Sequence, residues 1–317
     1  MTLQTRPATG VPPWPITLIT GPEKTGKSYA AAAATADPRI GRCLWVGIGE
    51  DDPDEYGAIP DARIDIVIHD GTYRGIINAL KDIAAEPAGD LPTLLVVDSM
   101  SRLWTLLQDM AQAEADDRAA RKAAKYKQAA PEPGSSDISM DLWNRAAQRW
   151  GHVMDAVRAH AGPVALTARL NVVTVLDIQG RPTKDKDVKV EGHKSLPYDV
   201  TAIVELEGPG KAVLRGVRSL RFPLAADERQ AFPDFTLPTL WERLGCFDRA
   251  GPRTHSRATA HVDWLAEIAA ADLDRLRVLW QAAGDYPDAD LIRESITQRK
   301  AELDGHEELT EPTQEEM

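Results

Sequence analysis

The sequence has few cysteines and no long apolar run, and both absences restrict the class of protein. Cysteine occurs only at Cys43 and Cys246 in 317 residues, which is too few for a disulfide framework or a cysteine-rich zinc site. No stretch approaches the roughly 18 consecutive apolar residues of a membrane-spanning helix, and residues 1–15 lack the basic-then-apolar pattern of a signal peptide. We therefore expect a cytoplasmic protein without a membrane partner.

Positive charge is also scarce. The 37 Lys and Arg residues are outnumbered by 49 Asp and Glu, and the formal net charge is −12 at pH 7. This balance argues against a uniformly basic surface but leaves room for a local basic channel. From Ala301 to the end there are seven acidic residues and no Lys or Arg. Residues 304–317 are therefore expected to form an acidic tail, either solvated and disordered or used for interaction or autoinhibition.

Apolar, β-prone runs alternate with helical patterns over much of the chain. Strands are expected at 16–20, 43–48, 64–68, 94–97 and 164–167, and helices at 27–36, 75–84 and 142–159. Such alternation is typical of a parallel sheet covered by helices. We expect an α/β fold with a mostly parallel central sheet.

The remaining segments indicate how this core is elaborated. We expect a flexible lead-in at 1–15, a core at 16–224 and a small helical C-terminal region at 225–303 before the acidic tail. Within the core, 107–138 is interpreted as an inserted helix and loop, and the polar, Lys-rich 171–192 as a hairpin or a mobile loop. Two further strands, 200–206 and 211–217, flank a Gly-Pro-Gly turn.

The strongest motif is a glycine-framed loop after the first expected strand. It reads Gly21-Pro22-Glu23-Lys24-Thr25-Gly26-Lys27-Ser28 and satisfies the pattern G-x-x-x-x-G-K-[ST]. The glycines let successive N–H groups turn toward phosphate oxygens, and the helix that follows adds the positive end of its dipole. Lys27 is expected to reach the β- and γ-phosphates and Ser28 to ligate Mg²⁺. We expect these eight residues and Tyr29 to contact ATP.

A second element of this site is an acid at the end of a buried strand. Residues 94–97 are wholly apolar and lead directly into Asp98. A strand buried on both faces delivers such a carboxylate at the carboxyl edge of the sheet. Beside the loop, Asp98 is expected to hold Mg²⁺ through water.

Three fuller segments resemble the RecA family over roughly residues 16–224. The loop opens with Gly21-Pro22-Glu23, the acid-ending strand reads Val96-Val97-Asp98-Ser99, and Gly49-Glu50-Asp51-Asp52-Pro53 is followed by Tyr56. The resemblance implies a RecA-like P-loop NTPase core that binds and hydrolyses ATP with Mg²⁺. It also implies that Glu50 activates the attacking water and that Asp52 and Tyr56 contact the adenine. Tyr56 comes one residue earlier than in the family pattern.

The resemblance extends to three groups of cationic residues. Arg169, after Thr167-Ala168, takes the place of a glutamine that senses the γ-phosphate in RecA. Residues 171–192 fall where the family has a mobile DNA-contacting loop, although a solvated hairpin is the alternative. Arg218 and Arg221 follow the expected strand 211–217, where the family sends cations into a neighbour's ATP site; plain surface charge is the alternative. The expected DNA contacts are Arg181, Lys184, Lys186, Lys189 and Lys194.

The motif order favours a DNA-stimulated ATPase that works as a homo-oligomer. A Trp-rich helix at 142–159 and the run Gly192-His193-Lys194-Ser195-Leu196-Pro197 look most similar to RecA-like ATPases of phages, some of which are single-strand annealing recombinases. This implies binding of single-stranded DNA, annealing or strand exchange, and a single-strand-binding protein as a further partner. The alternatives are a hexameric helicase-type motor, a P-loop small-molecule kinase and a nucleotide-gated regulator.

Overall fold

A computed structural model describes residues 7–50, 53–176, 179, 181–208, 210–225, 228–248, 253–255, 264–283 and 289–307. The chain divides into two compact units. One, here the core unit, comprises Met1–Ile138 and Trp150–Ser256; the other, the C-terminal unit, comprises Ser139–Arg149 and Arg257–Met317. No helix in the described part of the chain is long and apolar enough to cross a membrane.

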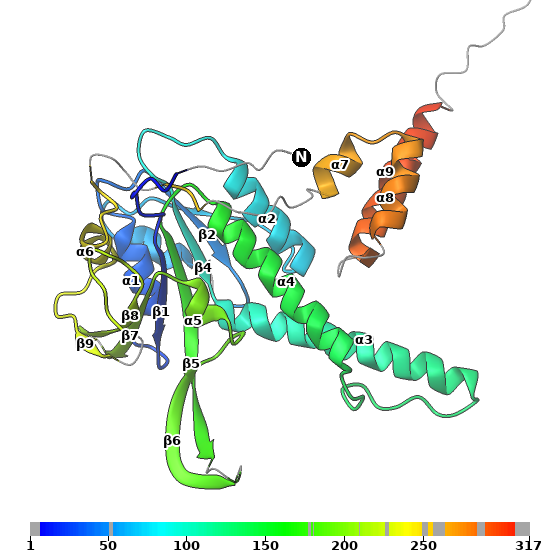
Figure 1. Cartoon of the computed structure of the whole chain (residues 1–317), viewed down its shortest axis with the longest axis horizontal. Helices are drawn as coiled ribbons and strands as arrows, with labels where there is room; N and C mark the ends of the chain where they lie inside the picture. The colour runs from blue at the N-terminus through cyan, green and yellow to red at the C-terminus, as the bar shows by residue number, and fades with distance from the viewer. Residues whose placement is uncertain are drawn as a thin grey trace, which may run out of the picture. The chain divides into compact units, whose positions relative to one another are not determined.

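A central sheet dominates the core unit (Figure 1). In the described residues its strands follow the order β3-β2-β4-β5-β1-β7-β8-β9. Neighbours from β3 to β7 pair in parallel, whereas β8 and β9 are antiparallel additions. The expected α/β fold with a mostly parallel sheet is confirmed. The strands are β1 (Ile16–Gly21), β2 (Cys43–Gly47), β3 (Ile64–Ile66), β4 (Leu94–Asp98), β5 (Val164–Leu176), β6 (Pro182–Val190), β7 (Ala202–Gly208), β8 (Lys211–Val217) and β9 (Gln230–Ala231).

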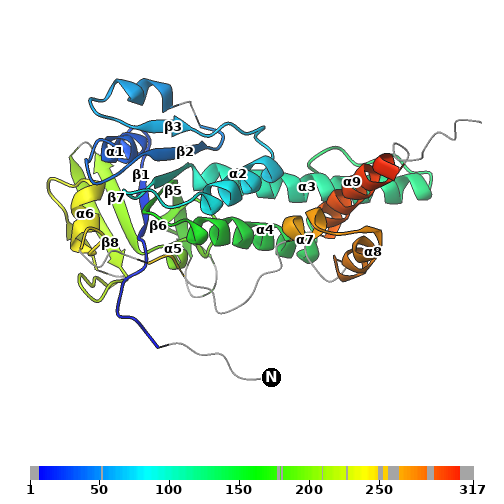
Figure 2. The same cartoon turned by 90° about the horizontal axis from the view of Figure 1, so that it is seen from above.

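Helices cover both faces of this sheet, which explains why strands β1 and β4 are buried along their whole length. Every residue of β1 and β4 is buried, as a parallel sheet covered on both sides requires. Figures 1 and 2 show α1 (Lys27–Ala34) and α6 (Leu237–Arg243) on one face, and α2 (Tyr73–Ala85) and α3 (Met100–Lys125) on the other. The helix expected at 142–159 is also present, as α4 (Met140–Ala159), and a short α5 (Leu196–Asp199) precedes β7.

Strand β5 extends beyond the central sheet. It pairs with β1 as far as Arg169, and from Leu170 onward it pairs instead with the antiparallel β6. The two strands form a ribbon that extends beyond the sheet (Figure 1). Of the two interpretations of 171–192, the structure has the hairpin for its described residues.

The predicted insertion is a long helix with a returning loop. α3 begins at Met100, earlier than the expected 107, and its 26 residues span about 39 Å. Its first half buries Met100, Leu103 and Leu107, and beyond that only alanines are buried. The second half therefore extends past the apolar core, as Figures 1 and 2 show.

The core unit continues beyond the expected boundary at residue 224. α6 packs on α1, and the buried Trp241 Nε1 donates to Thr17 Oγ1 at 3.0 Å. Residues 253–255 are tied to the lead-in, since Trp14 N donates to Arg253 O at 2.9 Å and Arg253 N to Pro12 O at 3.0 Å. The expected flexibility of 1–15 thus does not extend to residues 11–14. The boundary was misplaced because α6 is too short to show a helical repeat.

The C-terminal unit has a small helical core of its own. Its helices are α7 (Trp264–Ala269), α8 (Leu273–Ala282) and α9 (Ala289–Glu307). α7 and α8 are separate helices, since the Asp272 side chain accepts from Arg275 N and caps the start of α8. Of the predicted acidic tail, residues 308–317 lie outside the described residues.

Candidate functional site

The glycine-framed loop joins β1 to α1 at the carboxyl edge of the sheet. Gly21 ends β1 with φ 151°, and a Cβ there would lie 2.4 Å from the carbonyl oxygen of Leu206. Gly26 precedes α1 with φ 90°. Neither backbone position accommodates a side chain without strain. Glycine at both positions therefore lets the loop backbone turn so that its N–H groups can face a bound phosphate.

Lys27 lies folded into this loop. Its Nζ donates to the carbonyl oxygens of Gly21 at 3.1 Å and Pro22 at 2.7 Å. Burial lowers the pKa of Lys27, while the charges of Asp98 and Glu50 act in the opposite direction. The Lys27 ammonium donates to two neutral carbonyl oxygens in a partly desolvated loop. It can exchange these acceptors for the charged oxygens of a phosphate.

Asp98 lies beside the loop because only β5 separates β4 from β1. It is 6% exposed and accepts a hydrogen bond from the hydroxyl of the buried Thr167 on β5. Burial raises the pKa of Asp98, whereas hydrogen bonds from Thr167 and Ser28 and the charge of Lys27 lower it. The structure thus brings Ser28 and Asp98 together, as the sequence predicted.

These two oxygen donors fit a magnesium ion better than a transition metal. No group of three or more His, Cys, Asp or Glu side chains suited to a metal occurs among the described residues. Mg²⁺ needs few protein ligands, since it keeps several waters and takes the rest from substrate phosphates. Ser28 and Asp98 would hold such an ion at the mouth of the loop.

Glu50 is held by two partners at the same edge. Ser99 Oγ donates to Glu50 Oε1 at 2.7 Å, and Arg169 Nη2 lies 2.8 Å from both carboxylate oxygens. The Arg169 side chain is 45% exposed and that of Glu50 25%. The predicted base and the predicted phosphate sensor are thus an ion pair within the site.

Arg169 also stands at the root of the ribbon. Its backbone N–H donates to Ser101 Oγ at 2.9 Å, and that hydroxyl donates to Glu191 O at 2.6 Å. Glu191 N in turn donates to Arg169 O at 2.9 Å. The backbone of Arg169 is thus hydrogen-bonded, directly and through Ser101, to the residue that follows β6.

Tyr56 packs against two aromatic rings and lies close to Ser28. It lies in a 3₁₀ turn, Pro53–Ala58, with ring centroids 6.0 Å from Trp45 and 6.5 Å from Tyr29. Its hydroxyl is within hydrogen-bonding reach of Ser28, and burial raises the pKa of Tyr56. The structure thus places Tyr56 on the side of the proposed metal. Asp52, the other predicted base contact, lies outside the described residues.

A cavity of about 630 Å³ opens on the opposite side of the loop. Its lining includes Tyr29 on α1, Gly208 and Lys211 at the β7–β8 turn, and Phe235 and Thr236 before α6. This volume is in the range of ligand pockets. The sequence had assigned Lys24, Thr25, Gly26 and Tyr29 of this lining to ATP. It missed the residues from the β7–β8 turn and from the segment before α6, since the Gly-Pro-Gly turn was interpreted only as a turn and the 225–236 segment was placed outside the core.

Arg218 and Arg221 lie at the other edge of the sheet. Arg218 N donates to Thr201 O, and Thr201 is hydrogen-bonded to Ile16 at the start of β1. The glycine-framed loop follows the other end of β1, so the length of that strand, about 17 Å, separates Arg218 from the loop of its own chain. Arg218 is exposed and forms no ion pair within the described residues, whereas Arg221 is paired with Asp248. Neither can serve the nucleotide site of its own chain.

The predicted DNA contacts are spread along the ribbon and its base. Lys189 is exposed on β6 opposite Asn171, and Arg181 and Lys194 are exposed at the two ends of that strand. Lys184 and Lys186 belong to β6, but their side chains are outside the described part.

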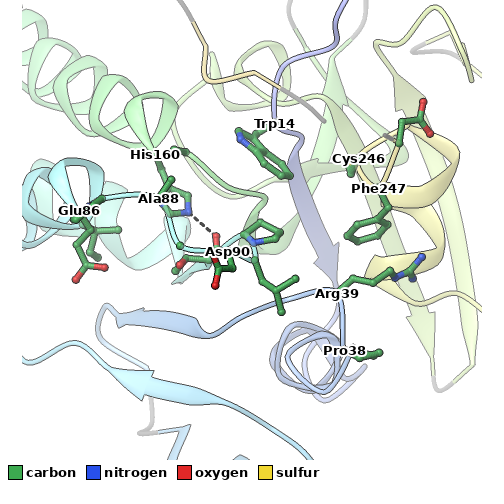
Figure 3. Close-up of a pocket in the computed structure, with 17 residues that line it drawn as sticks. Trp14, Pro38, Arg39, Glu86, Ala88, Asp90, His160, Cys246 and Phe247 are labelled. Atoms are coloured by element: carbon green, nitrogen blue, oxygen red, sulfur yellow. Dashed lines mark hydrogen bonds between the residues drawn. The ribbon is translucent and has the colours of Figure 1, made fainter. Parts of the chain in front are cut away.

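A second cavity, of about 500 Å³, opens at the same edge as Arg218 and contains none of the predicted site residues (Figure 3). Trp14 and Phe247 contribute aromatic walls, and Arg39 lies 4.0 Å above the Phe247 ring. Burial lowers the pKa of His160, whose Nε2 bonds Thr93 O at 2.8 Å. The carboxylates of this cavity include Glu86 and Asp248, which are already paired with Arg42 and Arg221.

Strand order, loop and acid together form a P-loop fold of the RecA-like arrangement, in which β5 lies between the strand that leads into the loop and the strand that ends in the acid. No family model matches the sequence, and no curated protein is similar to it. Solved structures with some likeness in fold include a RadB recombinase, at 16% identity and a TM-score of 0.39, covering 71% of this chain and 89% of the other. An ATPase from the type III secretion system of pathogenic bacteria has 15% identity and a TM-score of 0.32, covering 60% and 50%. The topology on its own, rather than these distant likenesses, defines the class.

Thr167→Val tests the support of the buried carboxylate. The substitution keeps the shape but removes the donor, so the free energy of unfolding at pH 7 should fall by about 1–3 kcal/mol. The bond favours ionised Asp98, so the loss is full above the raised pKa of Asp98 and shrinks as pH falls through it. Denaturant titrations at pH 7 and near pH 4 measure this, with Thr167→Ser as the control. A loss that is equal at both pH values would contradict the assignment.

Proposed function

We propose that this protein is a Mg²⁺-dependent ATPase that binds single-stranded DNA and acts as a homo-oligomer in annealing or strand exchange. The observation that carries the proposal is the convergence of Lys27, Ser28, Asp98, Glu50 and Arg169 on one loop. A loop that binds phosphate, an oxygen site for a metal, a base and a cation are the parts that phosphoryl transfer to water requires.

Binding of ATP rearranges the contacts of the loop itself. Lys27 exchanges the carbonyls of Gly21 and Pro22 for the β- and γ-phosphates, and the N–H groups of residues 21–28 face the same oxygens. Ser28 and Asp98 hold the Mg²⁺, which neutralises charge on the phosphates when bound. The cavity beside Tyr29 receives the base. Asp52 remains a proposed contact of the base by resemblance, whereas Tyr56, whose hydroxyl is near Ser28, is assigned to the side of the metal.

Hydrolysis requires that Glu50 be released. A carboxylate shared with a guanidinium at 2.8 Å is a poor proton acceptor, because ionic hydrogen bonds occupy its lone pairs. The γ-phosphate competes for Arg169, as RecA-like sensing implies, and leaves Glu50 oriented by Ser99 alone. Glu50 then accepts the proton of the attacking water.

The same movement reaches DNA through the ribbon. Ser101 and Glu191 connect Arg169 to the end of β6, so nucleotide state alters the ribbon at its root. Arg181, Lys184, Lys186, Lys189 and Lys194 contact the phosphate backbone there, a mode that depends on salt but not on sequence. A single-strand-binding protein is a natural further partner, and the site of action is the cytoplasm.

The position of Arg218 supports assembly. An exposed arginine at the edge opposite its own loop can complete only the site of another copy, and such head-to-tail contacts generate rings or filaments. Closed six-fold rings that translocate on DNA, seen by electron microscopy, would favour the second candidate, a hexameric helicase-type motor.

The primary test measures ATP hydrolysis with and without a dT oligonucleotide at low salt. We expect the oligonucleotide to stimulate turnover, because DNA on the ribbon acts on Arg169. Glu50→Gln should abolish turnover and keep ATP binding, since it removes the base but not the loop. Glu55→Gln, on an exposed residue of the 3₁₀ turn Pro53–Ala58, is the matched control. Absence of stimulation would contradict the DNA function, and full turnover by Glu50→Gln would contradict the mechanism.

Mixing two inactive variants tests the contribution of Arg218 to a neighbouring site. Lys27→Ala cannot hydrolyse ATP but supplies Arg218, whereas Arg218→Ala has an intact loop. A random equal mixture should regain about a quarter of parent turnover, because half of the loops are intact and half of those face a donor. Arg221→Ala, which removes a paired arginine, is the comparison. A mixture no more active than its separate components would exclude this role.

A further inference from the structure

The distal half of α3 carries an unusual concentration of positive charge. Between Arg118 and Pro131 the sequence has five cations and no acid, in a chain whose net charge is −12. Arg118, Arg121, Lys122 and Lys125 are spaced i, i+3, i+4 and i+7, which places them on one face of the helix. Lys127 follows directly. We call these five residues the α3 stripe.

The side chains of the stripe are exposed. Arg121, Lys122, Lys125 and Lys127 form no ion pair within the described part of the chain. Asp116, an acid on the same helix, accepts from Gly134 N at 2.6 Å and Ser136 N at 3.2 Å. That carboxylate holds the returning loop against the helix.

Helix stability alone does not account for this pattern. The negative end of the helix dipole favours cations in the last turn, which covers Lys122 and Lys125. It does not extend to Arg118 and Arg121, and the effect is lost beyond one turn. Like charges four residues apart on a helix, here Arg121 and Lys125, repel one another at low salt, so this charge costs stability unless a polyanion neutralises it.

The neighbouring aromatic residue narrows the chemistry of the partner. Tyr126 is 60% exposed, and Lys125 Nζ lies 6.0 Å from its ring centroid. An exposed ring beside a row of cations suits a strand that presents charged phosphates together with flat bases. A polyacidic peptide would use the cations and leave the ring unused.

We propose that the α3 stripe is a second contact for the backbone of single-stranded nucleic acid, separate from the β5–β6 ribbon. The stripe from Arg118 to Lys125 covers about 10 Å of helix, enough for two or three phosphates. Tyr126 provides a surface on which one base stacks. This inference deepens the proposed function and rests on its DNA partner.

The test compares salt dependence in the full-length protein. The variant Arg121→Gln/Lys122→Gln/Lys125→Gln removes three charges from the stripe, and Lys81→Gln/Arg277→Gln/Lys300→Gln removes three exposed charges elsewhere. Binding of a labelled dT oligonucleotide is followed by anisotropy over a range of salt. We expect the stripe variant to lower the slope of log K against log salt by about 2, at roughly 0.7 per lost contact. The control triple should keep the parent slope.

Two further measurements separate the possible outcomes. Tyr126→Ala should weaken binding roughly tenfold with an unchanged slope, because it removes stacking and no charge. Hydrolysis of ATP without DNA should be equal in all variants, which would show that they are folded.

If the parent binds and the stripe variant keeps its slope, the stripe is excluded and the proposed function stands. A parent that does not bind overturns both, and polyglutamate binding as tight as dT of equal length overturns the nucleic-acid assignment.

Discussion

The burial of one carboxylate beside one ammonium is the constraint on which the rest of the structure depends. Asp98 is almost inaccessible and its pKa is raised by that burial, while the pKa of Lys27 is lowered for the same reason. Each charge is tolerated because of the other and because Thr167 and Ser28 offer hydroxyls. These groups can meet only if β5 alone separates the two strands that deliver them. The strand order, which places only β5 between β1 and β4, therefore brings Asp98 to the glycine-framed loop.

The sequence predicted those parts whose physics is local. A strand, a glycine-framed turn and a helix follow one another along the chain, so residues 21–28 could be assigned without a structure, as could a buried strand ending in Asp98. The pairing of Glu50 with Arg169 could not, because 119 positions separate them and no pattern encodes a side-chain contact. Tyr56 was assigned by resemblance to the base, but its hydroxyl lies near Ser28. α6 was placed outside the core because seven residues show no periodicity.

Charge is distributed unevenly over this acidic chain, and exposed cations occur at three places where the account needs contacts with phosphate. One set lies along the ribbon, beyond the residues that link it to Arg169. Another lies at the sheet edge opposite the loop, and a third along the end of α3. At the nucleotide edge, Glu50 and Asp98 need a cation to balance their charge. A bound nucleotide, a neighbouring copy of the chain and a DNA strand would each supply charge opposite to that of the surface they contact.

The central claim is that residues 21–28 enclose a triphosphate whose metal is held beside Asp98. Calorimetric titration of ATP with Mg²⁺ into the parent and into Asp98→Asn tests it most directly. The account predicts saturable binding by the parent that weakens by at least tenfold when Mg²⁺ is withdrawn, and a variant whose affinity no longer responds to Mg²⁺. Equal affinity and equal magnesium dependence in the two proteins would contradict it.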